Sequence, residues 1–162
     1  MTDNDSHQQL WNRISGERFV MFNTVDTDGR LSSRPMTLVQ KDFDGSLWFF
    51  TSLRAPLVAA VELNPSVGVT IGDRSHDLYV SMRGQARVSR DRLQMEILWQ
   101  PAVQPWFPDG IDDPDIALLE VVLEDAEYWD VKESKLTQLV KLAGAVVQHQ
   151  RAQLGEHGHL RL

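Results

Sequence analysis

Apolar and polar residues alternate along much of the chain, and this spacing of two is typical of half-buried β-strands. The clearest stretch is 78–88, where every second residue starting at Leu78 is apolar or glycine. Shorter runs of the same character predict strands at 19–25, 31–39, 47–51 and 67–71. Asp28-Gly29 and Asp44-Gly45 separate the first three of these runs, and a glycine in that position suits a hairpin turn. These three strands are therefore predicted to form an antiparallel meander.

The second half of the chain mixes strand and helix periodicities. Further strands are predicted at 116–123, at 126–131 and around Leu160 and Leu162. Helices are predicted at 7–14, from Ala55-Pro56 to Asn64-Pro65, at 91–99 with Ser89 as its cap, and at 136–147. In the last of these one face carries the apolar residues Leu136, Leu139, Val140, Ala143, Val146 and Val147. The segment 101–114, which carries four prolines, is predicted to be an irregular loop. Helices do not regularly separate the strands, so the pattern favours a mainly β fold over a doubly wound parallel sheet. We expect a six- to seven-stranded antiparallel barrel with helices packed outside.

Composition narrows the class of protein. The 162 residues, 42% hydrophobic and 24% charged, are predicted to form a single domain spanning 1–162. A net charge of -7 gives no general attraction to nucleic acid or to an anionic membrane, so neither is expected as a partner. The chain has no cysteine, which excludes disulfides and thiol nucleophiles. Its polar N-terminus and its lack of a long apolar stretch lead us to expect a cytoplasmic protein.

Two short segments could bind an anion. In Phe50-Thr51-Ser52-Leu53-Arg54 an apolar strand ends in two hydroxyls and an arginine, just before a predicted helix. Hydroxyls, a cation and free helical N–H groups are what a phosphate needs, although Thr51 and Ser52 equally suit helix capping. The second segment is Arg34-Pro35-Met36-Thr37, where proline inside a strand indicates an edge or a bulge. Arg34 could pair with an anion there, but a solvated arginine on an edge strand is the simpler interpretation.

Other candidate chemistry is weaker. Trp106 and Phe107 lie between prolines and could cover a flat ligand or plug the end of the barrel. The acidic segment 109–115 lacks the spacing of a calcium loop and is interpreted as a solvated turn. His157 and His159 would share a strand face, but two ligands make a poor metal site, so no metal is assigned. No motif identifies catalytic residues.

The order of these motifs resembles one family, the pyridoxamine 5′-phosphate oxidase-like, FMN-binding split-barrel proteins, and within it the general stress protein branch. The resemblance spans about Leu10 to Leu162. The motifs that carry it are Ser33-Arg34-Pro35-Met36, Leu47-Trp48-Phe49-Phe50-Thr51-Ser52, Asn64-Pro65-Ser66-Val67, Tyr79-Val80-Ser81 with Gly84, Arg90-Asp91-Arg92 leading to Leu98-Trp99, Trp106-Phe107-Pro108-Asp109-Gly110 with Asp112-Asp113-Pro114, and Ala126-Glu127-Tyr128-Trp129-Asp130.

The resemblance implies an FMN-binding split barrel that forms a homodimer with two flavin sites at the subunit interface. It implies that the strand from Arg34 to Thr37 borders the flavin ring and that Phe50 to Ser52 reach the ring and the phosphate. Trp106 and Trp129 become candidates for aromatic residues near the flavin, often from the other subunit. The family's phosphate-binding serine and lysine correspond to Ala55 and Leu57 here. The resemblance therefore leaves Arg34 and Arg54 as the cations for the phosphate.

Three functions remain open at this point. The first is an FMN-dependent redox flavoprotein in a stress response, with FAD as an alternative cofactor. The second is a non-catalytic flavin binder or sensor. The third is a split-barrel interaction module whose phosphate site has been lost, which the residues Ala55 and Leu57 suggest. The C-terminal segment 158–162 does not reproduce the substrate-binding residues of true pyridoxamine phosphate oxidases, so that reaction is not assigned.

Overall fold

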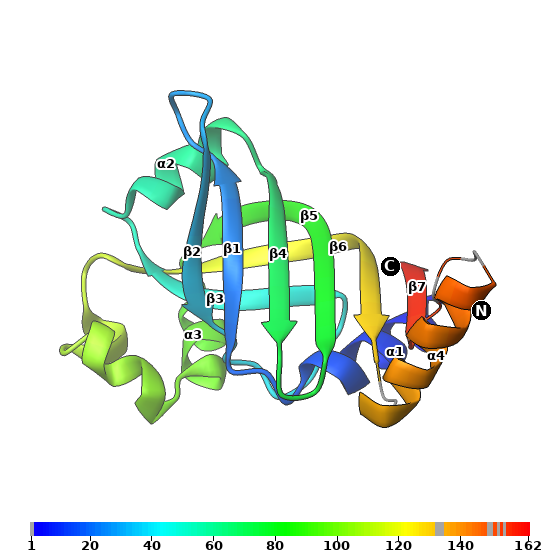
Figure 1. The fold of residues 1–162 in the computed structure, drawn as a ribbon. Coiled ribbons are helices and arrows are strands. Elements are labelled where there is room, and N and C mark those ends of the chain that lie inside the picture. The colour runs from blue at the N-terminus through cyan, green and yellow to red at the C-terminus, as the bar shows by residue number, and fades with distance from the viewer. Residues whose placement is uncertain (1, 132–134, 149–150, 152, 154) are drawn as a thin grey trace.

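Antiparallel strands form one strongly curved sheet, with helices outside it (Figure 1). This computed structural model describes residues 2–131, 135–148, 151, 153 and 155–162. The strands are β1 (Phe19–Val25), β2 (Leu31–Thr37), β3 (Ser46–Ser52), β4 (Ser66–Asp73), β5 (Leu78–Ser89), β6 (Ile116–Asp130) and β7 (Glu156–Arg161). The prediction of a mainly β barrel with outer helices is confirmed.

The strand order is β2-β1-β4-β5-β6-β3, with β7 beside the second half of β6. The predicted break between 116–123 and 126–131 is wrong, because β6 is one 15-residue strand. The polar residues that suggested a break form a β-bulge, in which Glu124 is the extra residue where the register with β5 shifts between Arg83 and Gly84. The Arg83 guanidinium donates to the Asp125 carboxylate at 2.7 Å, which keeps the irregular segment paired to β5.

The predicted meander of the first three strands is also wrong. The strands β1 and β2 form a hairpin, but β3 pairs with β6, and this leaves β2 and β3 as the two ends of the strand order. The reason lies in the connection that follows β2. The Gln40 side chain accepts a hydrogen bond from the Trp48 N–H at 2.9 Å and donates to the Ser46 carbonyl at 2.8 Å. The Gln40 amide thereby occupies two backbone groups on the edge of β3 that could otherwise form hydrogen bonds with a neighbouring strand.

Helices lie before, between and after these strands, and the first three of them pack against the barrel. They are α1 (Asp3–Ile14), α2 (Pro56–Leu63), α3 (Arg92–Leu98) and α4 (Lys135–Val147), with short 3₁₀ helices η1 (Pro101–Trp106) and η2 (Gly110–Asp112) in the segment predicted as an irregular loop. The helix α1 begins earlier than predicted because Thr2 and Asp5 form a capping box. The cap of α3 is Asp91 rather than Ser89, since the Asp91 carboxylate accepts from the N–H groups of the next turn.

Two apolar clusters hold these elements together. The larger fills the barrel and includes Phe22, Phe49, Met82 and Leu119, all fully buried. The smaller lies under α3 and η1, and its members are Val39, Met95, Leu98, Val103, Phe107, Ile116 and Leu118. The second cluster fixes the η1 segment against β3 and the start of β6, and so positions the wall of the site described below.

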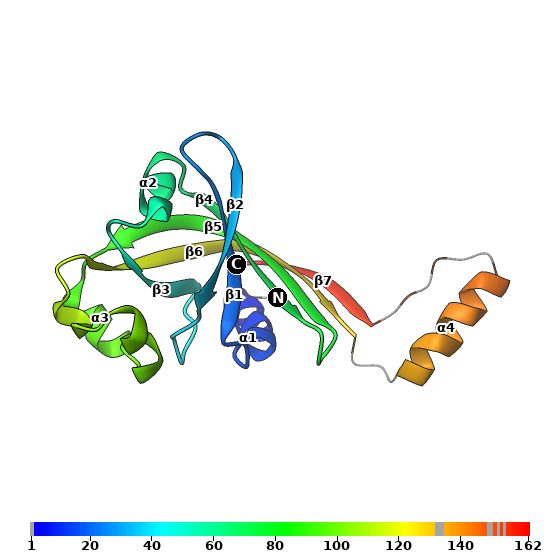
Figure 2. The same cartoon turned by 60° about the vertical axis from the view of Figure 1, so that its left-hand side comes forward.

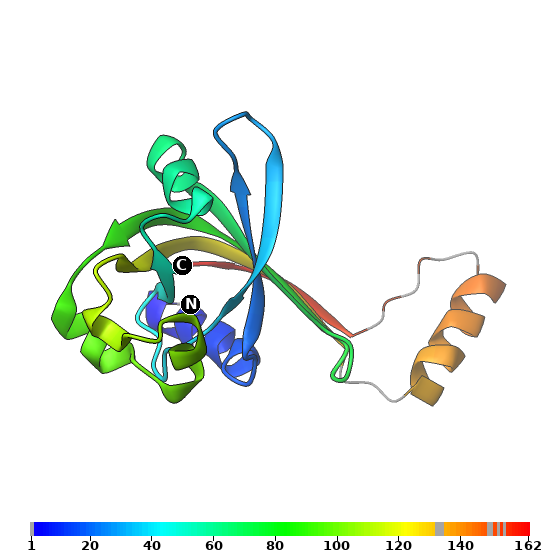
Figure 3. The same ribbon diagram turned by 90° about the vertical axis from the view of Figure 1, so that its left-hand side faces the viewer.

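The predicted C-terminal helix forms as α4, but it stands away from the barrel beyond the ends of β5 and β6 (Figures 2 and 3). Its apolar residues are exposed, namely Leu139, Val140, Leu142, Val146 and Val147. The side chain of Leu136 lies outside the described part of the chain. Among the described residues, no helix combines the length and hydrophobicity that crossing a lipid bilayer requires.

Candidate functional site

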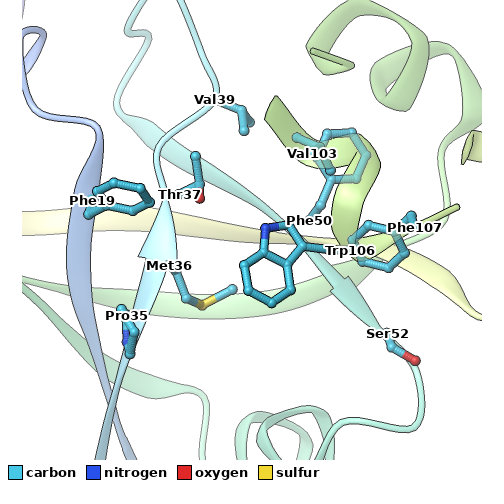
Figure 4. Close-up of a pocket in the computed structure, with 10 residues that line it drawn as sticks. All are labelled: Phe19, Pro35, Met36, Thr37, Val39, Phe50, Ser52, Val103, Trp106 and Phe107. Carbon is cyan, nitrogen blue, oxygen red and sulfur yellow. The ribbon is translucent and has the colours of Figure 1, made fainter. Parts of the chain in front are cut away.

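A pocket of about 390 Å³ lies between the edges of β2 and β3, where the curved sheet does not close (Figure 4). We call this gap the seam. The pocket is lined by Phe19, Pro35, Met36, Thr37, Val39, Phe50, Ser52, Val103, Trp106 and Phe107. Its volume falls within the range of small-molecule sites.

The β2 side of the seam presents backbone groups as well as side chains. Leu38 N–H donates to the Arg18 carbonyl and Asp26 N–H donates to the Arg30 carbonyl, so the even-numbered residues of β2 direct their backbone groups toward β1. The odd-numbered residues, among them Pro35 and Thr37, direct theirs into the seam. Proline is tolerated here because an edge position needs no N–H for the ladder. Thr37 can therefore offer an N–H and a carbonyl, and Pro35 a carbonyl, to a ligand.

The backbone groups on the β3 side of the seam alternate in the same way. Leu53 N–H donates to the Asp115 carbonyl and Leu123 N–H to the Gly45 carbonyl, so the odd-numbered residues of β3 bond to β6. The backbone groups of Phe50 and Ser52 consequently face the seam. Pro35, Thr37, Phe50 and Ser52 therefore bring both backbone groups and side chains to the pocket, and Met36 adds its side chain.

The side walls of the pocket are aromatic and apolar. Phe50 meets Trp99 edge-on with ring centroids 5.5 Å apart and lies 6.4 Å from Phe107. Phe107 is buried, whereas Trp106 is 75% exposed and its indole reaches over the pocket toward Met36 (Figure 4). None of the ten lining side chains is charged. A flat, largely apolar ligand with hydrogen-bonding groups on its rim suits such a cleft.

The structure brings together part of the predicted site. Six of the ten candidate residues line the pocket, namely Pro35, Met36, Thr37, Phe50, Ser52 and Trp106. Sequence reasoning did not select Phe19, Val39, Val103 or Phe107 as site residues. Phe107 adjoins a selected residue and had a local signal, but Phe19 and Val39 look like ordinary strand residues, and only the position of the seam brings them to the pocket.

Arg34 and Thr51 do not line the pocket. Thr51 is buried at 6% exposure. The Arg34 side chain turns toward the β1–β2 hairpin, where Nη2 donates to Ser32 at 2.8 Å and to Thr24 at 3.1 Å and lies 3.5 Å from the Asp26 carboxylate. Its other terminal nitrogen, Nη1, is buried without a hydrogen-bond partner. This orphaned donor is the feature of Arg34 that fits an anionic ligand.

Arg54 lies just past the Ser52 end of the pocket, and its side chain is 82% exposed. Its Nε lies 2.7 Å from the Asp115 carboxylate. The helix α2 follows, with Ala55 as an N-cap that makes no side-chain hydrogen bond. Neither Thr51 nor Ser52 caps α2, and the Ser52 hydroxyl instead accepts from the Arg54 N–H at 3.2 Å.

Trp129 lies on the outer face of the sheet, away from this pocket. It pairs with Tyr79 on β5 and with His157 on β7, and its ring stacks on the imidazole at 5.0 Å. His157 Nε2 lies 2.7 Å from the Glu127 carboxylate, and the other strand histidine, His159, lies 3.6 Å from Asp125. Within the described residues, no three His, Asp or Glu side chains are arranged to hold a metal ion.

Comparison with known proteins places this chain in a family. The model of the family described as "Pyridoxamine 5'-phosphate oxidase like" matches residues 5–153. The chain belongs to this family. The resemblance seen in the sequence and the FMN-binding split-barrel fold are both confirmed.

Individual members of the pyridoxamine 5′-phosphate oxidase-like family align over most of the chain. General stress protein 26 of Bacillus subtilis (strain 168) is 27% identical over 137 residues, which is 82% of this chain and 94% of that protein. The crystal structure of the general stress FMN/FAD binding protein from Xanthomonas citri is 31% identical, with a TM-score of 0.68, and covers 82% of this chain and 92% of its own. A protein from Jannaschia sp. CCS1, provisionally described as a general stress protein 26, shares the fold over 98% of this chain and 99% of its own, with a TM-score of 0.75 and 24% identity.

Proposed function

We propose that this protein is a flavoprotein that binds FMN at the seam and has flavin-dependent redox capacity in a stress-response context. The observation that carries the proposal is the pocket itself, a cleft between two strand edges with aromatic walls and backbone hydrogen-bonding groups on both sides. An isoalloxazine ring is flat and largely apolar, with carbonyl and N–H groups along its rim. Family membership and the flavin named for the Xanthomonas citri relative support the same ligand.

The residues of the seam would contact different parts of the flavin. Thr37 and Pro35 would meet the polar rim of the ring with their backbone groups, and Phe50 and Ser52 would do so from the opposite edge. Phe107 and Val103 would form the apolar wall, and Trp106 would cover the exposed side and exclude water. The flavin would supply hydride or single-electron transfer, and the protein would supply position and polarity.

We also propose that two copies associate through the outer face of the sheet. That face carries exposed apolar side chains on three strands, Phe19 and Met21 on β1, Tyr79 on β5 and Trp129 on β6, with β4 between β1 and β5. Exposed apolar patches of this kind commonly mark interfaces. Phe19 also lines the pocket, so this face meets the site at the β1 end, and Trp129 lies on β6. A two-fold axis through this face would bring Trp129 of each copy toward the pocket of its partner.

The experiment that tests flavin binding is FMN titration of purified protein, followed by gel filtration and visible absorption. We expect flavin absorption to travel with the protein and flavin fluorescence to be quenched. Light scattering on the same column would give the mass of the dimer. A protein that neither retains nor quenches FMN at tens of micromolar would refute the proposal and favour the interaction module.

Redox capacity needs a separate measurement. Anaerobic mixing of the loaded protein with NADH or NADPH, followed at the flavin band, should show reduction on a time scale of seconds to minutes. Bound flavin that neither donor reduces would instead favour the non-catalytic binder.

A further inference from the structure

The pocket has an apolar end and a polar end. Val39, Val103 and Phe107 line the apolar end, under η1. Ser52 lies at the other end, where β3 stops and the chain continues toward α2 (Figure 4). A flavin ring seated against the aromatic wall would therefore direct its ribityl tail, and any terminal phosphate, toward Ser52 and the residues that follow it.

The cation that follows Ser52 is already paired with a carboxylate. Arg54 is the cation nearest in sequence to Ser52, and its guanidinium lies 2.7 Å from the Asp115 carboxylate. Asp115 immediately precedes Ile116, the residue paired with Ser52, and its carbonyl accepts the Leu53 N–H at 2.7 Å. This carboxylate acts against a phosphate in two ways. It engages the cation, and it repels a dianion that approaches the same place.

The start of α2 adds little to hold a phosphate. Its N-cap, Ala55, has no hydroxyl, and Pro56 at the first helical position has no N–H to donate. Leu57 is 5% exposed and packs in the barrel core, so its side chain points away from solvent. Arg34 Nη1 has no hydrogen-bond partner, but Nη2 already donates to Thr24 and Ser32 and lies close to the Asp26 carboxylate.

We infer that the site recognises flavins by the ring and is nearly indifferent to the terminal phosphate, with Asp115 as the residue that removes the preference. Riboflavin and FAD should therefore bind within about tenfold of FMN. A phosphate held by two charge-assisted hydrogen bonds would instead be favoured by at least about a hundredfold. The inference rests on the proposed function, because it concerns the same pocket.

The test is a comparison of dissociation constants for riboflavin, FMN and FAD with the full-length protein. Fluorescence quenching serves for riboflavin and FMN, and calorimetry serves for FAD. We expect all three constants to agree within about tenfold. FMN bound more than tenfold tighter than riboflavin would overturn the inference while leaving the flavoprotein proposal intact. Binding of none of the three would overturn both.

Two matched variants isolate the role of Asp115. Asp115→Asn removes the carboxylate but keeps the backbone carbonyl that bonds to Leu53, and it frees Arg54. We expect FMN to bind about three- to tenfold tighter, with riboflavin unchanged within twofold. Asp112→Asn is the control, because it removes a carboxylate from the same loop that pairs with Arg92 instead. Equal effects of the two variants on FMN would show that Asp115 has no specific role.

Discussion

Replacing Trp106 by alanine should weaken flavin binding without weakening the fold. The indole is 75% exposed in the free protein, so its loss removes few native contacts. Substitutions at such positions change the free energy of unfolding by no more than about 0.5 kcal/mol. For a protein of 162 residues this corresponds to a shift in Tm of less than about 2 °C. A stacked aromatic pair contributes about 0.5–1.5 kcal/mol beyond its buried area. The loss of stacking alone should therefore raise the dissociation constant for FMN about 2- to 12-fold, and the loss of buried area adds to this rise.

Flavin fluorescence quenching measures this constant, and thermal unfolding of the free protein measures the stability. Trp106→Phe should retain most of the affinity, since it keeps an aromatic ring. Leu93→Ala is the control for loss of an exposed apolar side chain, because Leu93 is 72% exposed on α3 and does not line the pocket. An unchanged constant in Trp106→Ala would refute the contact between the indole and the flavin. A drop in Tm of several degrees would show that Trp106 serves the fold instead.

Three further predictions concern stability and protonation. Gly84→Ala should lower the free energy of unfolding, measured in urea, by several kcal/mol. A Cβ at this position would lie 2.9 Å from the backbone carbon of Val122, and the backbone cannot move aside. A loss below about 1 kcal/mol would contradict the bulge geometry. Gln40→Leu should lower the free energy of unfolding by about 1–3 kcal/mol in the same assay, because it leaves two β3 backbone groups without a hydrogen-bond partner. An unchanged urea midpoint would mean that water replaces the amide. The hydrogen bond that the protonated His76 ring donates to the Asp73 carboxylate raises the pKa of His76 above its usual 6.5. The contribution of this pair to stability is therefore complete below about pH 6.5 and is lost as pH rises through the higher folded pKa. NMR titration of the His76 ring should show this raised pKa, and a value in Asp73→Asn equal to that of the parent protein would exclude the pair as its cause.

Much of the local structure could be predicted from the sequence. Strand β1 has its predicted bounds, and β4 and β5 differ by a few residues, because alternation of apolar residues depends only on which face of the strand is buried. Pro35 indicated an edge strand for a reason that is also local, since proline lacks the N–H that a central strand donates. Six predicted residues line the pocket because the motifs that suggested them lie on β2, β3 and the segment beside β3.

The choice of strand partners was decided only by the tertiary structure. The alternation in β3 is the same whether it pairs with β2 or with β6, so the sequence suggested a meander where the chain forms a seam. The pairing of Arg54 with Asp115 likewise joins residues that lie far apart in the sequence. The exposure of the apolar face of α4 could not be read from its periodicity, which predicts a helix but not what covers it. Local patterns specify which face of an element is apolar, whereas the seam, its pocket and its charges depend on contacts between distant segments, which only the folded chain brings together.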